Sequence, residues 1–220
     1  QKNYDLALAD YNKAIELNDV NEKNILHRAF FYAMFKTYLA LSEYNAISIL
    51  DLNDSDSYIL RADYFFIIGK NEDALLDFNK AIQLSPNDVD YYLARARFYD
   101  NNSFKKLALD DYLKVIELNP YNIDVLLKSA SYLKDGNNLF CIELCSKIIE
   151  LSNANTTVYY NRASSYQKLK KYELSLLDFN KAIELMPKNI IAYFGRSICY
   201  RELKDYSLAI LDLEKCIKLV

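Results

Sequence analysis

The sequence repeats one ten-residue phrase at regular intervals. Residues 77–86 read DFNKAIQLSP and residues 178–187 read DFNKAIELMP, and weaker copies begin at three further Asp residues. The leading residues are Asp10, Asp77, Asp111, Asp178 and Asp212, so the intervals are 67, 34, 67 and 34 residues. A period of about 34 residues is typical of arrays of helical hairpins, in which each unit buries its apolar face against its neighbours. The period therefore predicts a repeat array.

The composition favours an all-α chain. Only 3 Gly and 3 Pro occur in 220 residues, which is too few turn residues for a β-sandwich or barrel, whereas 52% of the residues are hydrophobic. When unit positions are numbered from 1 to 34, Pro86, Pro120 and Pro187 all fall at position 32, where each is expected to end a helix. Each unit contains two apolar-periodic stretches separated by a turn such as Gly69-Lys70-Asn71.

The repeat boundaries follow from this alignment. We expect a single array over residues 1–220, composed of a partial repeat at 1–21 and units at 22–54, 55–88, 89–122, 123–155, 156–189 and 190–220. Because the chain begins in the middle of a unit, the pattern predicts a fragment of a longer protein. Unit 22–54 has an apparent insertion between its helices, and unit 123–155 lacks one residue around its turn at 135–138. Altered hairpin geometry is expected in both.

Small and bulky side chains alternate at fixed unit positions. Position 8 holds Ala29, Ala62, Ala96, Ala130, Ala163 and Ser197. Position 20 holds Ala7, Ser42, Ala74, Ala108, Cys141, Ser175 and Ala209. Position 24 carries bulk, in Tyr11, Phe78, Tyr112, Phe179 and Leu213. Small residues allow two helices to approach closely, and the bulky residue is expected to fill the space between one hairpin and the next.

With small residues at positions 8 and 20, aromatic residues near 4, 11 and 24, and Pro at 32, the chain resembles the tetratricopeptide repeat over essentially its whole length. The resemblance implies a right-handed α-solenoid, a superhelix of tandem helix-turn-helix hairpins with a concave groove. One departure is that the chain has no Trp, which the family usually places at position 4. That position is occupied by Ile25, Tyr58, Tyr92, Leu126, Tyr159 and Tyr193.

A recurring Arg and Asp predict structural ion pairs. Position 7 holds Arg28, Arg61, Arg95, Arg162 and Arg196, and position 23 holds Asp77, Asp111, Asp178 and Asp212. Unit 123–155 has Ser129 and Leu144 instead, so both charges are lost together. A joint loss within one unit indicates that the Arg and Asp of the same hairpin pair across its two helices. A ligand-binding role for these arginines is the alternative.

The sequence contains no recognisable catalytic or cofactor-binding pattern. The lone histidine, His27, has no recurring acid near it, and the three glycines are isolated, so no phosphate-binding loop is formed. Neither enzymatic activity nor a cofactor is expected. The net charge of −3 gives no electrostatic drive toward nucleic acid. No stretch is apolar enough to insert into a membrane.

The four cysteines, Cys141, Cys145, Cys199 and Cys216, predict core packing rather than chemistry. A metal site would need further ligands near the Cys141 and Cys145 pair, and the only histidine lies far away in sequence. We therefore expect no metal. Free cysteines of this kind favour a reducing, cytoplasmic location.

The resemblance implies that the first helix of each hairpin lines the groove and binds a protein or peptide partner. The predicted groove residues are Lys23, His27, Phe30, Met34, Ile59, Asp63, Phe66, Leu93, Arg97, Lys128, Ser131, Tyr160, Asn161, Ser164 and Phe194. Asp56, Leu60, Lys134 and Ile198 occupy further positions of the same face. Of the residues that form a carboxylate clamp for chaperone tails in some family members, only Asn161 is present. An apolar segment, helical or extended, is therefore the expected ligand.

Two questions stay open at this point. The groove aromatics are either exposed to a ligand or packed between neighbouring first helices. A non-catalytic scaffold is the favoured function. The alternatives are the targeting arm of a larger enzyme or co-chaperone, and an assembly module that associates with itself through the open ends of the array at Tyr4–Leu17 and Lys215–Val220.

Overall fold

The computed structural model describes residues 2–17, 22–35, 54–152 and 155–219, and all regular structure within these ranges is α-helical. The helices in residues 1–111 are α1 (Lys2–Leu17), α2 (Glu22–Phe35), α4 (Ser55–Ile67), α5 (Asn71–Leu84) and α6 (Val89–Asn101), and α7 (Lys105–Leu118) follows. The remaining helices are α8 (Ile123–Leu133), α9 (Asn138–Leu151), α10 (Thr156–Lys168), α11 (Tyr172–Leu185), α12 (Ile190–Glu202) and α13 (Tyr206–Leu219). The chain divides into two compact units, unit 1 at 1–111 and unit 2 at 112–220.

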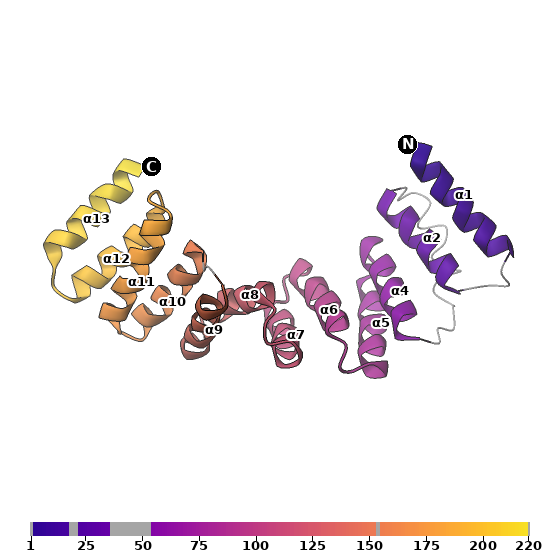
Figure 1. Cartoon of the computed structure of the whole chain (residues 1–220), viewed down its shortest axis with the longest axis horizontal. Helices are drawn as coiled ribbons and strands as arrows, with labels where there is room; N and C mark the ends of the chain where they lie inside the picture. Colours follow the sequence, from indigo (N-terminus) through magenta and orange to yellow (C-terminus); the bar gives the residue numbers. More distant parts are fainter. Residues whose placement is uncertain (1, 18–21, 36–53, 153–154, 220) are drawn as a thin grey trace. The chain divides into compact units, whose positions relative to one another are not determined.

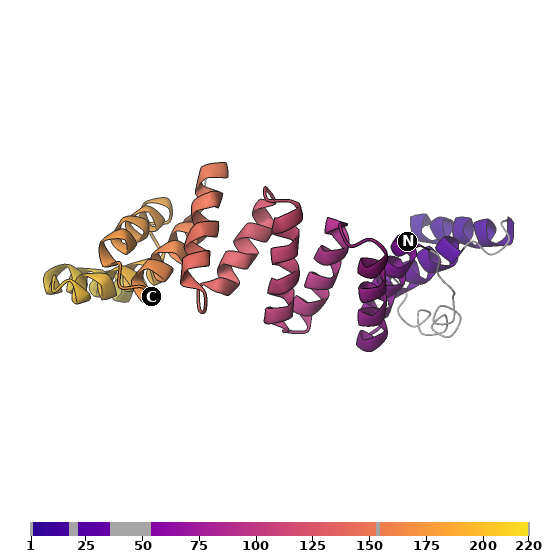
Figure 2. The same cartoon turned by 90° about the horizontal axis from the view of Figure 1, so that it is seen from below.

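Consecutive helices pair as hairpins within each unit. In both views, α4 lies beside α5, α10 beside α11, and α12 beside α13 (Figure 1 and Figure 2). Within unit 1, α5 packs on α6, and within unit 2, α9 packs on α10 and α11 packs on α12. The predicted all-helical hairpin architecture is confirmed for the described ranges. Among these helices, none is both long and apolar enough to cross a bilayer.

Polar caps fix the start of five of the described first helices. Asp54, Asp88, Asn122, Asn155 and Asn189 are the N-cap residues of α4, α6, α8, α10 and α12. Each side chain accepts a hydrogen bond from a backbone N–H of the first turn, as Asn189 does from Ala192 at 3.1 Å. These N–H groups have no partner within the helix, so an Asx side chain at this position sets where the helix begins.

The hairpin turn repeats one left-handed residue. Gly69 has φ +80°, and Ser103, Lys170 and Lys204 occupy the equivalent turns with φ between 59° and 65°. In the hairpin of α8 and α9, the first helix has 11 residues instead of 13, and the turn at 134–137 contains no residue with positive φ. The predicted change of hairpin geometry in unit 123–155 is therefore confirmed. The second half of unit 22–54, at 36–53, lies outside the described residues.

The small residues lie where the two helices of a hairpin meet. All six residues at position 8 are buried, and so are Ala74, Ala108, Cys141, Ser175 and Ala209 at position 20. Ser42 and the side chain of Ala7 lie outside the described part. Contact between the two positions is direct, because Ser175 Oγ donates to the carbonyl of Ala163 at 2.8 Å. A larger side chain at either position would push the two helices apart.

The Arg and Asp of one hairpin form a bidentate ion pair across its two helices, as predicted. Arg162 donates from Nε and Nη2 to the two carboxylate oxygens of Asp178, at 2.7 and 2.8 Å. The pairs Arg61–Asp77, Arg95–Asp111 and Arg196–Asp212 have the same geometry. The Asp side chains are only 6–7% exposed. Bidentate pairs of this kind add directional restraint as well as energy.

The same arginines also join neighbouring hairpins, which the sequence analysis did not foresee. Nη1 of Arg95 donates to Asn79 Oδ1 of the preceding hairpin at 2.6 Å. Arg196 and Asn180 repeat this contact at 2.6 Å, whereas Arg162 reaches Ser146 at 3.0 Å. One guanidinium therefore holds its own hairpin closed and holds the preceding hairpin in register.

We expect Asp178→Leu to lower the free energy of unfolding by about 3 kcal/mol, because it leaves the guanidinium of Arg162 half-buried without its carboxylate. The double variant Arg162→Ser, Asp178→Leu copies the Ser129 and Leu144 of unit 123–155 and should recover most of this loss. Urea unfolding followed by circular dichroism measures both. A double variant no more stable than Asp178→Leu would contradict the pairing argument. Leu177→Ala, at an exposed neighbouring position, is the control.

Candidate functional site

The predicted groove residues lie on the first helices of the hairpins. Within unit 1, these helices are α2, α4 and α6, and within unit 2 they are α8, α10 and α12. The structure brings some of the predicted residues together in one pocket of each unit. Phe30, Met34, Phe66, Leu93, Arg97, Lys128 and Ser164 are on the same helices but line neither pocket.

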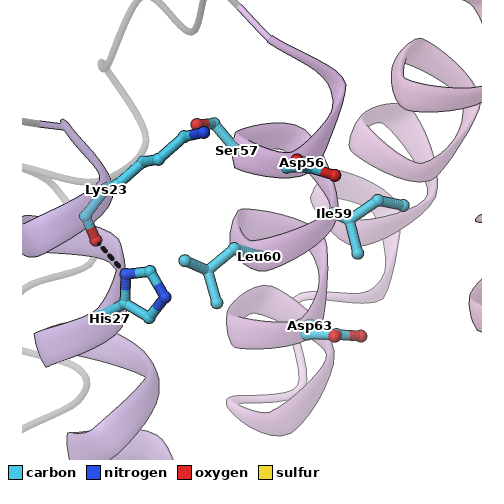
Figure 3. Close-up of a pocket in the computed structure, with 7 residues that line it drawn as sticks. All are labelled: Lys23, His27, Asp56, Ser57, Ile59, Leu60 and Asp63. Carbon is cyan, nitrogen blue, oxygen red and sulfur yellow. Dashed lines mark hydrogen bonds between the residues drawn. The ribbon is translucent and has the colours of Figure 1, made fainter. Parts of the chain in front are cut away.

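The unit 1 pocket has a volume of about 310 Å³ and lies between α2 and α4. Its lining consists of Lys23, His27, Asp56, Ser57, Ile59, Leu60 and Asp63. Figure 3 shows Lys23 extended across the pocket toward Ser57, and Leu60 turned toward the ring of His27. Ser57 is the lining residue that the sequence analysis did not name. The pocket therefore combines an apolar floor with charged side chains.

Hydrogen bonds fix the polar groups around this pocket. His27 Nδ1 lies 2.6 Å from the carbonyl oxygen of Lys23, so the N–H of that nitrogen donates to it and leaves Nε2 free to accept in the neutral ring. The Lys23 ammonium lies 3.3 Å from Asp54, the N-cap of α4. Asp56 accepts from the hydroxyl of Tyr91 at 2.6 Å.

Asp63 is the polar group in this pocket that is left unpaired. Burial raises the pKa of its carboxyl from 3.8 to about 6, and the nearby Arg97 guanidinium offsets only part of that effect. No described residue forms a hydrogen bond or an ion pair with the Asp63 carboxylate. In Figure 3, this carboxylate projects from α4 on the side away from His27. A desolvated carboxylate without a partner favours binding of a cationic or hydrogen-bond-donating ligand group.

The raised pKa of Asp63 predicts that unfolding becomes easier as pH rises. Between about pH 4 and pH 6 the folded protein binds more protons than the unfolded chain, so the free energy of unfolding falls through this window. Asp63→Asn removes this dependence and should be about 3 kcal/mol more stable than the parent at pH 7. The difference should vanish below about pH 4.

Urea unfolding at several pH values measures the effect of Asp63→Asn. The matched control is Asp110→Asn, because Asp110 is exposed on α7. A carboxyl titration of Asp63 by NMR provides the direct check. A midpoint near or below pH 4 would contradict this account of its burial.

The unit 2 pocket has a volume of about 240 Å³ and is bounded by α8, α10 and the start of α12. It is lined by Ser131, Lys134, Thr156, Thr157, Tyr160, Asn161, Asn189 and Ile191. The ammonium of Lys134 lies 5.8 Å from the centre of the Tyr160 ring. Thr156, Thr157, Asn189 and Ile191 were not predicted, because they lie at helix starts contributed by two hairpins.

Asn161 is the most buried polar residue of the unit 2 pocket. It is 2% exposed, yet no described residue makes a hydrogen bond to its side-chain amide. Because Asn161 lines the pocket, its amide is accessible to a ligand there. The bond with Cys141 Sγ uses the backbone carbonyl of Asn161 and leaves the amide unaffected.

The aromatic residues of the predicted face divide between packing and exposure. Phe66 packs edge-on against Phe98 of the next hairpin, with ring centres 5.4 Å apart. Tyr160 contacts Phe179 at 6.0 Å between ring centres. Phe194 is 53% exposed. Packing between neighbouring helices thus accounts for part of the predicted aromatic surface.

The cysteines lie mostly in the core. Cys141, Cys145 and Cys199 are free and buried, and Cys216 is free and partly exposed. Across the described ranges, no three His, Cys, Asp or Glu residues gather as potential metal ligands. The cysteines therefore form no candidate site, and the candidate ligand contacts are the residues that line the two pockets.

The comparisons with known proteins identify the repeats. A profile described as "Tetratricopeptide repeat" matches residues 157–189, and a second profile of the same description matches 55–88 and 190–219. No curated protein matches the chain by sequence.

Solved structures match by fold. A crystal structure of MamA protein is 17% identical, with a TM-score of 0.66 over 75% of this chain and 91% of that chain. YrrB, titled "a TPR protein with an unusual peptide-binding site", is 18% identical, with a TM-score of 0.66 over 81% and 90%. MamA 41-end from Desulfovibrio magneticus RS-1 is 17% identical, with a TM-score of 0.64 over 77% and 97%. At these identities the likeness concerns the fold alone.

Proposed function

Because this chain is a tetratricopeptide-repeat protein, we propose that it is a non-catalytic scaffold that binds a peptide or helix of a partner protein against the first helices of its hairpins. Repeats of this family mediate binding to proteins and peptides. YrrB, which is similar in fold, is described as having a peptide-binding site.

The unpaired amide of Asn161 is the observation that carries the proposal. The Asn161 amide reaches the solvent of the pocket and makes no hydrogen bond to a described residue, so its hydrogen-bonding groups are available to a ligand. An Asn side chain offers one carbonyl acceptor and one NH₂ donor. A peptide backbone offers the complementary N–H and C=O groups. A backbone segment entering the unit 2 pocket would satisfy both sides of the amide.

The neighbours of Asn161 favour a ligand that also carries apolar side chains. Tyr160 and Ile191 line the same pocket, and Ile191 is 60% exposed. Ser131 and Thr157 add hydroxyl groups that can bind further backbone atoms. This mixture suits a short segment that places its backbone against Asn161 and its apolar side chains against Tyr160 and Ile191.

The unit 1 pocket supports the same kind of ligand with different polarity. Ile59 and Leu60 supply its apolar surface. His27 Nε2 and the Asp63 carboxylate are available to accept hydrogen bonds from ligand donors. The two pockets therefore differ in what they select, because Lys134 contributes a positive charge in unit 2, whereas Asp63 contributes a negative charge in unit 1 above about pH 6.

We expect Asn161→Leu to reduce partner capture about tenfold, because it removes both hydrogen-bonding groups while keeping the branched shape and the number of heavy atoms. The same change should leave the free energy of unfolding unchanged or raise it by about 1 kcal/mol, since no internal hydrogen bond is lost. Opposite effects on binding and stability distinguish a ligand contact from a structural residue.

Capture is measured by quantitative pull-down from native lysate with the parent chain and the variant side by side. Asn87→Leu, at an exposed position between α5 and α6, is the matched control and should capture the same proteins as the parent. A parent-like capture profile for Asn161→Leu would refute the proposal for the unit 2 pocket. A loss of stability would assign Asn161 to the core instead.

A further inference from the structure

One of the carboxylates around the unit 1 pocket has no hydrogen-bond or ion-pair partner in the described part of the chain. Asp54, beside the pocket, lies 3.3 Å from the ammonium of Lys23. Asp56 accepts a hydrogen bond from the hydroxyl of Tyr91 at 2.6 Å. The third carboxylate, that of Asp63, has neither kind of contact. The pocket therefore contains one negative charge that a ligand can neutralise.

The nearby basic groups do not supply the missing partner. The ammonium of Lys23 is paired with Asp54 at the start of α4. Arg97, on α6, is exposed and acts on the Asp63 carboxylate only through space. When His27 is neutral, the lining of the pocket carries one positive and two negative charges. The electrostatic potential of the pocket thus favours a cation over an anion.

An aliphatic surface leads to the Asp63 carboxylate. Figure 3 shows Asp56, Ile59 and Asp63 projecting from the same side of α4, with Ile59 between the two carboxylates. Two helical turns separate Asp56 from Asp63, a rise of about 10 Å along the helix. Leu60 adds a second aliphatic side chain to the lining. A long methylene chain with a charged end can pack its methylenes here and place its charge at Asp63.

The size and the donor set of the pocket favour an organic cation. A volume of about 310 Å³ is at the small end of ligand pockets, which suits one side chain rather than a whole helix. Calcium and magnesium ions take six or more oxygen ligands. Over the described ranges, no three His, Cys, Asp or Glu side chains gather as potential metal ligands. An ammonium or guanidinium group on an apolar stem fits both observations.

We propose that the unit 1 pocket binds a lysine or arginine side chain of the partner segment, with its methylenes on Ile59 and Leu60 and its cationic group paired with Asp63. This inference rests on the proposed function and narrows its ligand to a segment with a basic residue. A neutral residue at the same place would leave the Asp63 carboxylate desolvated and unpaired, so the pocket selects against it.

Binding of a cation at Asp63 competes with binding of a proton. Burial raises the pKa of the Asp63 carboxyl to about 6, so this group is ionised at pH 7.5 and mostly protonated at pH 5 in the free chain. The other charged or titratable groups of the pocket are Lys23 and His27 on α2 and Asp56 on α4, and Arg97 approaches from α6. A basic ligand should therefore bind about tenfold more weakly at pH 5 than at pH 7.5.

The test uses an acetylated and amidated peptide, Ala-Leu-Ala-Lys-Ala-Leu-Ala, titrated into the whole chain at pH 7.5 and followed by backbone amide shifts in NMR spectra. A second peptide has norleucine in place of Lys, which keeps an apolar stem and removes the charge. We expect the lysine peptide to bind at least tenfold more tightly, with its largest shifts at Ile59, Leu60 and Asp63. A peptide with Arg in place of Lys should show the same preference over norleucine.

Two matched variants test whether Asp63 makes the contact. Asp63→Asn should bind the lysine and norleucine peptides equally, because it removes the charge that distinguishes them. Asp110→Asn removes the same charge from an exposed position on α7 and should keep the tenfold preference. The pH effect should disappear in Asp63→Asn and persist in His27→Gln, which removes the imidazole of the pocket.

Several results would overturn the inference. Equal binding of the two peptides by the parent would do so while leaving the proposed function intact, and so would a preference for lysine that survives Asp63→Asn. Absence of binding by both peptides would also overturn it. If the Asp63 carboxyl of the free chain titrates near or below pH 4, a cationic group of this chain already occupies the pocket, and the inference fails. Failure of the proposed function would appear separately, as parent-like capture by Asn161→Leu.

Discussion

The guanidinium group of an Arg such as Arg196 binds its own hairpin and the preceding hairpin at once, and the rest of the fold depends on these bonds. Within the phrase Asp178-Phe179-Asn180, Asp178 accepts from Arg162 of its own hairpin, and Asn180 accepts from Arg196 of the next. Phe179, between them, fills the gap beneath Gly195. Asp77 and Asn79 serve Arg61 and Arg95 in the same way. The Asp-Phe-Asn sequence is repeated because its three consecutive side chains make three different contacts. Substitution of any one of them would weaken a different contact within or between hairpins.

The sequence was sufficient where a contact lies within one repeat. The joint absence of Arg and Asp at Ser129 and Leu144 predicted the ion pair inside each hairpin. Small residues at positions 8 and 20 predicted their close approach. The contact of Arg95 with Asn79 was not foreseen, although the signal was present. Each such Asn precedes an Arg by 16 residues, the same spacing that separates Arg from its Asp. The same spacing therefore relates an Arg both to its own hairpin and to the preceding one.

The sequence predicted which face of the first helices contains the candidate site, but not which residues on that face line a pocket. The resemblance indicated which helix positions point toward a partner, but burial at those positions depends on the distance between neighbouring first helices. Phe66 packs against Phe98, whereas Phe194 is 53% exposed. The state of Asp63 depends equally on three-dimensional distance, since Arg97 affects its carboxyl without pairing with it. The periodicity of a sequence does not predict whether a carboxylate and a guanidinium on neighbouring helices form an ion pair.

The hairpin of α8 and α9 lacks contacts that stabilise the neighbouring hairpins. It lacks the Arg–Asp ion pair, its first helix is two residues shorter than α6 and α10, and the hydroxyl of Ser129 is buried without a hydrogen-bond partner. Apolar packing and a hydrogen bond from Cys141 Sγ to the carbonyl of Ala130 join its two helices, so we expect it to be the least stable hairpin of unit 2. The same hairpin supplies Ser131 and Lys134 to the unit 2 pocket. A ligand in this pocket would contact both α8 and α10, so its binding would stabilise the packing of this hairpin on the next one.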